Sequence, residues 1–213
     1  MLKRRRQRGD TLIEVLFAVS VFSLVVVGAL SIMNQGTAAS QRALEITLVR
    51  QQLDAQAETL RFMHDSYVAA YQSGITFNYT DGTTTPAEEW AQMVDRIKAV
   101  NIRSASPLNS NGSVCPAAPT GSFIVDPRNV DYIGTPATLQ PAQTFAQVTY
   151  DNNGIFTGSQ GMWIEGVRSI QSGDSDQSNT GYIDFHLRAC WDSSGLPVPL
   201  TLGTIVRLYE PRG

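Results

Sequence analysis

An uncharged, largely apolar run at residues 15–32 is the feature that most constrains this chain. Its length matches the ~17–25 residues that a helix needs to cross a bilayer. Five basic side chains lie directly before the run, within residues 3–8. Because positive charge holds such an end in the cytoplasm, the rest of the chain is expected outside the membrane.

One carboxylate, Glu14, lies at the front edge of the apolar run. A charged group at membrane depth costs roughly 2.5–3.5 kcal/mol on insertion scales, so a residue of this kind usually marks a function and a partner. A charge that only reaches back to the membrane surface is the alternative. The sequence therefore singles out Glu14 as the first candidate functional residue.

The residues around Glu14 form a recognisable pattern: the basic stretch ends in Gly9, and Asp10 is followed by Thr-Leu-Ile-Glu and the apolar run. This pattern resembles the N-terminal signal of type IV pilins and pseudopilins, over roughly residues 3–33. The resemblance implies that a prepilin peptidase cuts after Gly9, so that the mature chain starts at Asp10. It also implies that Glu14, fifth in the mature chain, is the carboxylate used in subunit assembly.

Asp10 departs from the family pattern, in which the mature chain usually begins with Phe or Met. Cleavage is read mainly at the Gly, so the resemblance still implies a cut after Gly9. It further implies that the same peptidase methylates the new amino group of Asp10. The chain also has no proline near Ser31, where major pilins often carry one.

Two other interpretations of the N-terminal segment stay open at this point. It is either a secretory signal peptide cut before Ser40, after the small residues 37–39, or a plain signal anchor with an incidental Glu14. The apolar run exceeds the ~7–15 residues usual for the apolar part of a signal peptide. The three interpretations predict different first residues for the mature protein: Asp10, Ser40 or Met1.

The charge of the chain argues against nucleic acid as a partner. The whole chain has a net charge of −3, but the basic N-terminal stretch holds five of its 16 basic residues. The remainder carries 11 basic and 19 acidic residues, a net charge of −8. Such a body repels phosphate backbones.

Cys115 and Cys190 are the only cysteines. An exported location favours a disulfide between them, although two separate thiols remain an alternative. Two cysteines with no histidine at ligand spacing make a poor zinc site. Asp174 and Asp176 are weak calcium candidates, because some pseudopilins hold calcium near the carboxyl terminus, but the turn glycine and the twelfth-position glutamate of a calcium loop are missing. No cofactor is expected.

Apolar periodicity predicts one helix over residues 10–72, with residues 10–33 as the membrane-spanning and filament-core part and residues 34–72 as its amphipathic continuation. The amphipathic stripe is Ile46, Val49, Leu53, Ala57, Leu60, Met63, Tyr67 and Tyr71. Packing on a sheet explains this stripe; a parallel coiled coil is the competing explanation.

Residues 73–213 are expected to form a globular α+β body. A second helix is predicted over about residues 86–100, because Thr85 and Glu88 form a capping box and Pro86 occupies the first helical position. Residues 104–120 read as loop. Strands are predicted at residues 145–150, 154–157, 162–171, 182–191 and 204–209. The expected fold is α+β: a long N-terminal helix packed on an antiparallel sheet, like a type IV pilin.

The sequence offers no catalytic constellation. His64 and His186 have no serine or cysteine in a known nucleophile context. The chain is therefore predicted to be a non-enzymatic filament subunit, and the features above favour a minor pilin. A type II secretion or competence pseudopilin, or a membrane-anchored ligand-binding envelope protein, is the alternative.

The resemblance also implies partners and a location. The implied partners are other pilin subunits, prepilin peptidase, the inner-membrane assembly platform and, before assembly, membrane lipid. The protein is expected as a single-pass membrane protein first and in an extracellular filament afterwards.

Overall fold

The computed structural model describes residues 10–75, 77, 84–100, 102, 104–108, 114–134, 139–169 and 181–211. Contacts divide the chain into two compact units, Met1–Leu44 and Glu45–Gly213. We call the described residues of the second unit the head.

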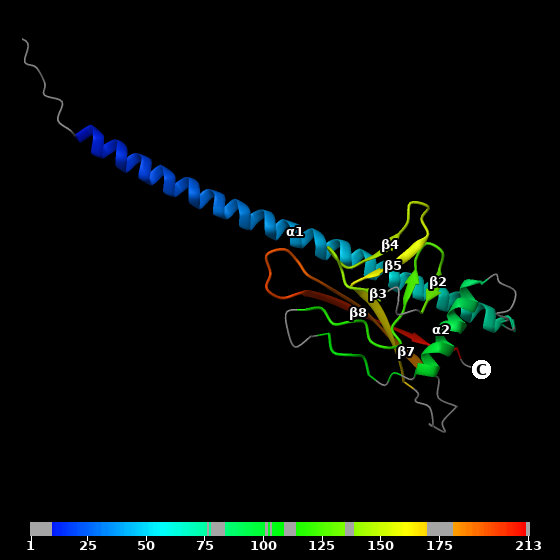
Figure 1. Cartoon of the computed structure of the whole chain (residues 1–213). Coiled ribbons are helices and arrows are strands. Elements are labelled where there is room, and N and C mark those ends of the chain that lie inside the picture. Colours follow the sequence, from blue (N-terminus) through cyan, green and yellow to red (C-terminus); the bar gives the residue numbers. More distant parts are fainter. Residues whose placement is uncertain are drawn as a thin grey trace, which may run out of the picture. The chain divides into compact units, whose positions relative to one another are not determined.

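The described residues contain two helices, α1 over Asp10–Gln72 and α2 over Pro86–Val100 (Figure 1). The end of α1 follows from Gly74, which adopts a positive φ of 70° that a residue with a Cβ disfavours. The amide of Ile75 then bonds the carbonyl of Ala70, a helix-terminating pattern. The helix thus ends at Gln72, two residues before this glycine and at the predicted boundary.

The start of α2 is a capping box. The Thr85 amide donates to Glu88 Oε2 at 2.8 Å, and the Glu88 amide donates back to the Thr85 hydroxyl at 3.4 Å. This reciprocal pair satisfies two amides that a helix start leaves without partners. Trp90, Met93 and Ile97 lie on the buried face that follows.

The head contains three small sheets, with strand orders β1-β2, β3-β5-β4 and β6-β7-β8. The strand bounds are β1 Ile124–Asp126, β2 Asp131–Ile133, β3 Leu139–Gln140, β4 Gln147–Tyr150, β5 Phe156–Gln160, β6 Met162–Arg168, β7 Tyr182–Trp191 and β8 Leu200–Tyr209. All pairs are antiparallel except β3 with β5. The α+β prediction, with a long N-terminal helix and antiparallel sheets, is confirmed. Strands β1, β2 and β3 were not predicted, since each has only two or three residues.

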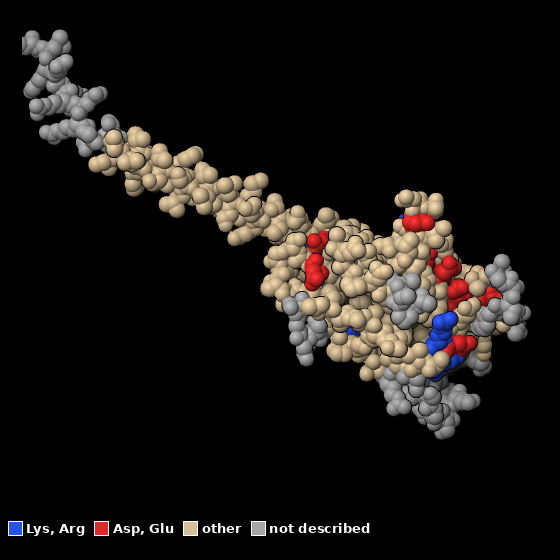
Figure 2. Space-filling view, viewed as in Figure 1, with Lys and Arg blue, Asp and Glu red and all other residues tan. Residues whose placement is uncertain are grey.

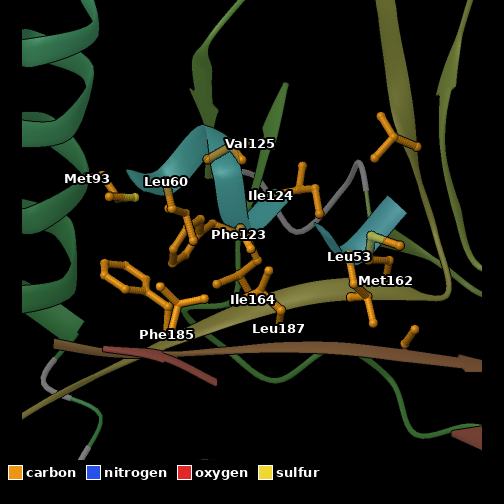
Figure 3. Packing of buried hydrophobic residues seen from close by; sticks show 14 of the residues in the cluster. Leu53, Leu60, Met93, Phe123, Ile124, Val125, Met162, Ile164, Phe185 and Leu187 are labelled. Carbon is orange, nitrogen blue, oxygen red and sulfur yellow. The ribbon is translucent and has the colours of Figure 1, made fainter. Parts of the chain in front are cut away.

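The core of the head lies between the second part of α1, helix α2 and the sheets. Figure 3 shows Leu60 of α1 and Phe185 of β7 among the side chains that converge there. Phe123 meets Phe185 edge to face, with ring centroids 6.3 Å apart. The members buried to 2% or less include Val49, Leu53, Leu60, Met63, Trp90, Met93, Phe123, Ile164, Phe185 and Leu187. Burying apolar side chains of this size is the main stabilising contribution to the head.

The amphipathic stripe of α1 is buried only in its middle. Ile46 and Tyr71, at its two ends, keep 37% and 39% of their surface exposed, whereas Leu60 is fully buried. The stripe packs on the protein's own core, which is the explanation that the sequence favoured over a coiled coil.

Candidate functional site

The first part of α1, residues 12–33, carries apolar side chains that contact no core. Leu24, Ile32 and Phe17 have 74%, 73% and 71% of their surface exposed. This helix is the one in the described chain that is long and apolar enough to cross a membrane, with a mean hydropathy of 2.6 over an 18-residue window and none of that window buried. In the view of Figure 2 this part of the helix shows no charged side chain, whereas charged side chains appear on the head.

Two of the three serines within the apolar segment, Ser20 and Ser23, have hydroxyl groups that are satisfied by the helix itself. Ser20 Oγ donates to the Leu16 carbonyl and Ser23 Oγ donates to the Val19 carbonyl, each at 2.8 Å. A hydroxyl bonded to the preceding turn no longer needs water. The two serines therefore do not prevent residues 12–33 from lying in lipid or between apolar helices.

Glu14 lies on this exposed apolar helix, close to its start at Asp10. The residue is exposed, and no described residue gives its carboxylate a hydrogen bond or an ion pair. In hydrocarbon a charge without a partner is costly. The geometry therefore leaves Glu14 available for a group from outside the described chain.

Four further predicted positions, Gly9, Asp10, Asp174 and Asp176, have no described side chain. Gly9, on the proposed cleavage bond, lies outside the described residues, as do the calcium candidates Asp174 and Asp176. Asp10 is described only as the first residue of α1. Among the described residues, no group of three His, Cys, Asp or Glu side chains is arranged to hold a metal ion.

The two cysteines form a disulfide, which confirms the predicted pairing of Cys115 with Cys190. Cys190 lies on β7, and Cys115 lies in the loop that the sequence predicted over residues 104–120. The bond therefore holds this loop against the carboxyl-terminal end of β7. A disulfide that closes a long stretch of chain typically contributes about 2–4 kcal/mol.

The same loop is held by a second contact, a hydrogen bond to Glu165, that was not predicted from the sequence. Glu165 on β6 is fully buried, and it accepts hydrogen bonds from the Ser106 amide at 2.8 Å and from Trp163 Nε1 at 3.0 Å. Arg188 forms an ion pair with it at 3.1 Å. A buried carboxylate is tolerated when it is paired and bonded in this way. The strand alternation could not reveal it, because alternation places Glu165 on the face expected to meet water.

The two histidines, His64 and His186, have backbone, aromatic and charged groups of the head as neighbours. His64 Nε2 donates to the Tyr209 carbonyl at 2.8 Å, and its ring meets Trp90 edge to face at 5.0 Å. Burial and the neighbouring Arg188 lower the pKa of His186, and these effects outweigh Asp184 and Glu165, which raise it. Within the described chain, no hydrogen-bond partner of either histidine is a serine or cysteine nucleophile.

Comparison with known proteins bears on the N-terminal segment. Residues 4–30 match the family described as the prokaryotic N-terminal methylation motif, the type IV prepilin signal. This motif indicates a prepilin of the type IV pilin or pseudopilin type, and the match includes Gly9, Asp10 and Glu14. No curated protein and no solved structure matches the chain significantly.

Proposed function

We propose that this chain is a structural subunit, most specifically a minor pilin, of a type IV pilus or related filament. It enters the membrane as a prepilin, prepilin peptidase cuts it after Gly9, and it polymerises through the first part of α1. The membrane holds it before assembly, and the cell surface filament holds it afterwards. Its partners are other pilin subunits, the peptidase and the inner-membrane assembly platform. It is not an enzyme.

The observation that carries this proposal is a coincidence in one segment. Within the segment that matches the prepilin motif, residues 12–30 carry the apolar side chains that lie exposed on α1. A monomer in water does not stably expose a large continuous apolar surface. Lipid before assembly and neighbouring apolar helices afterwards both cover it.

Glu14 is the residue that directs assembly. Cleavage creates a new amino group on Asp10, and a neighbouring subunit presents this positive charge to the Glu14 carboxylate. Two charges that pair as a subunit leaves the bilayer relieve the cost of holding each one in hydrocarbon. The lack of a described partner for Glu14 supports this role.

Replacement of Glu14 tests the pairing. Glu14→Ala is expected to lower incorporation into filaments at least about tenfold, the effect of ~1.4 kcal/mol, while cleavage continues. Glu58→Gln is a matched control, because it also removes an exposed carboxylate from α1, but within the head. Immunoblots of sheared filaments and of membranes give both readouts. Normal incorporation of Glu14→Ala would refute the pairing.

Replacement of Gly9 tests the cleavage site separately. Gly9→Ser, or a bulkier residue, is expected to leave the uncut precursor in the membrane, detected by its larger mass. Gln7→Ser makes a comparable change in the leader away from the bond and should be processed normally. A normally processed Gly9→Ser product would show that the cut lies elsewhere.

The choice between a major and a minor subunit is tested in cells that lack this protein. A minor pilin is expected to change the number or the function of filaments without abolishing them. Total loss of filaments would contradict the minor role and favour a major subunit. Intact pili together with a secretion or competence defect would instead favour the pseudopilin alternative.

A further inference from the structure

A second feature of the head has no part in filament assembly through α1. Four aromatic side chains from three separate segments line one cavity of about 210 Å³. Tyr67 and Tyr71 come from the end of α1, Phe77 follows that helix, and Trp90 lies on α2. We call this cavity the aromatic pocket.

The rings of the aromatic pocket lie close together. Tyr67 and Phe77 stack with centroids 5.0 Å apart, and Tyr71 lies 6.2 Å from Tyr67. Trp90 is only 2% exposed. Aromatic faces carry partial negative charge, so several rings around one cavity attract a cation of low hydration.

Two carboxylates, Asp95 and Glu210, also line the pocket, against a single cation, Lys98. Lys98 lies 3.7 Å from Asp95, and both side chains are largely exposed. Glu210 Oε1 is buried and accepts no hydrogen bond from the described residues; its one contact is an ion pair with Arg168 at 3.6 Å. Each carboxylate of the pocket thus lies near one cation, and Glu210 Oε1 still receives no hydrogen bond from the described residues.

The pKa of Tyr67 reflects both its burial and the two carboxylates. Its pKa is raised, first by burial and then by the negative charge of Glu210, with smaller contributions from Tyr71 and Asp95. Both carboxylates of the pocket thus act on the same ring. A field that opposes a phenolate favours a bound cation.

A second cavity provides a contrast within the same head. It lies beside the disulfide, has a volume of about 310 Å³, and has no charged side chain among its lining residues. Trp163 is its one aromatic lining residue. Two more cavities of the described residues, one beside Tyr132 and one beside His186, also lack this combination of several rings with carboxylates, which the aromatic pocket has.

We propose that the aromatic pocket binds a small alkylated ammonium compound. The cation lies against the faces of Tyr67, Tyr71 and Phe77, Trp90 closes the cavity, and Glu210 supplies the counter-charge. Recognition depends on both the alkyl surface and the positive charge. This function is additional to filament assembly and does not depend on it.

Choline and its neutral counterpart 3,3-dimethylbutan-1-ol, which has the same shape without the charge, test the proposal. Each is titrated into the full chain in maltoside micelles, with binding followed by calorimetry and by tryptophan fluorescence. Choline is expected to bind at least about tenfold more tightly than the neutral alcohol. Equal binding of the two, or no binding of choline, would overturn the proposal.

Four variants locate the site. Glu210→Gln and Tyr71→Leu are each expected to weaken choline binding about tenfold. Tyr71→Phe keeps the ring and should bind as the unaltered chain does. Asp54→Asn is the matched charge control, since this exposed carboxylate of α1 does not line the pocket. With circular dichroism confirming that each variant is folded, unchanged binding in both Glu210→Gln and Tyr71→Leu would overturn the assignment.

Discussion

The two parts of α1 differ in whether a polar side chain has a hydrogen-bond partner among the described residues. In the head, Gln56 is fully buried, its Nε2 donates to the Val125 carbonyl at 2.7 Å, and its Oε1 accepts from the Val125 amide at 3.0 Å. In the apolar segment, Glu14 has no partner among the described residues. The head therefore satisfies both polar groups of the Gln56 side chain, whereas no described residue pairs with Glu14.

The apolar side chains of α1 also differ between its two parts, in this case in how deeply they are buried. Leu60 is fully buried, whereas Leu24 of the same helix is 74% exposed. Burial of a leucine contributes about 1.5–3 kcal/mol, so only the head gains this stabilisation from its own fold. One helix thus contributes to a core in its second part and exposes apolar side chains in its first part.

Truncation of one leucine in each part gives the largest expected effect. Leu60→Ala is expected to lower the free energy of unfolding of the head by about 2–5 kcal/mol, because it opens a cavity in the core. Leu24→Ala should leave that free energy unchanged. Chemical denaturation in maltoside micelles, followed by tryptophan fluorescence, measures both. Equal losses in the two variants would remove the distinction between the parts of α1.

Much of this division was predictable from sequence, because local patterns encode it. Apolar periodicity predicted α1, and the capping residues Thr85 and Glu88 predicted the start of α2. The Asn-Gly turn after β4 was also predictable: Gly154 has a φ of 80°, and Asp151 Oδ1 accepts from the Asn153 amide at 2.8 Å. Strands β1–β3 were missed because they are too short to show alternation and depend on distant partners such as Gln56.

Removal of the buried amide gives a smaller effect. Gln56→Ala is expected to cost about 1–3 kcal/mol of head stability, because the Val125 amide and carbonyl remain buried without a partner. Gln51→Ala changes an exposed glutamine of the same helix and should cost little. The same denaturation measurement applies. A loss in Gln56→Ala no greater than in Gln51→Ala would show that α1 does not depend on this bond.

Lowering the pH is expected to have the smallest effect, which is a loss of stability of the head. The pKa of His186 is lowered by burial and by Arg188. As the pH falls below the ordinary histidine pKa of about 6.5, His186 takes up a proton in the unfolded chain before it does so in the folded chain. The free energy of unfolding therefore decreases as the pH falls, until the pH is below the pKa of His186 in the folded state. His186→Gln should therefore show a flatter dependence of the unfolding midpoint on pH just below 6.5. An unchanged slope would contradict this cause.

The candidate sites were predictable to different degrees. Glu14 and Gly9 lie within one short N-terminal pattern, so sequence alone was sufficient to propose them. The loop attachment at Glu165 joins residues 59 positions apart, Ser106 and Glu165, and no local pattern encodes it. The aromatic pocket likewise brings together Tyr67, Trp90 and Glu210 from separate elements. Such sites emerge only when the fold places distant segments side by side.

The first residue of the protein in its natural membrane or filament tests the central claim most directly. Purification from that source, followed by N-terminal sequencing and intact-mass measurement, identifies it. The account predicts a chain that starts at Asp10, with the mass of the first nine residues removed, and a methyl group on its amino terminus if the peptidase also modifies it. A chain that starts at Ser40, or one that retains Met1, would contradict assembly through Glu14 and a newly exposed amino group.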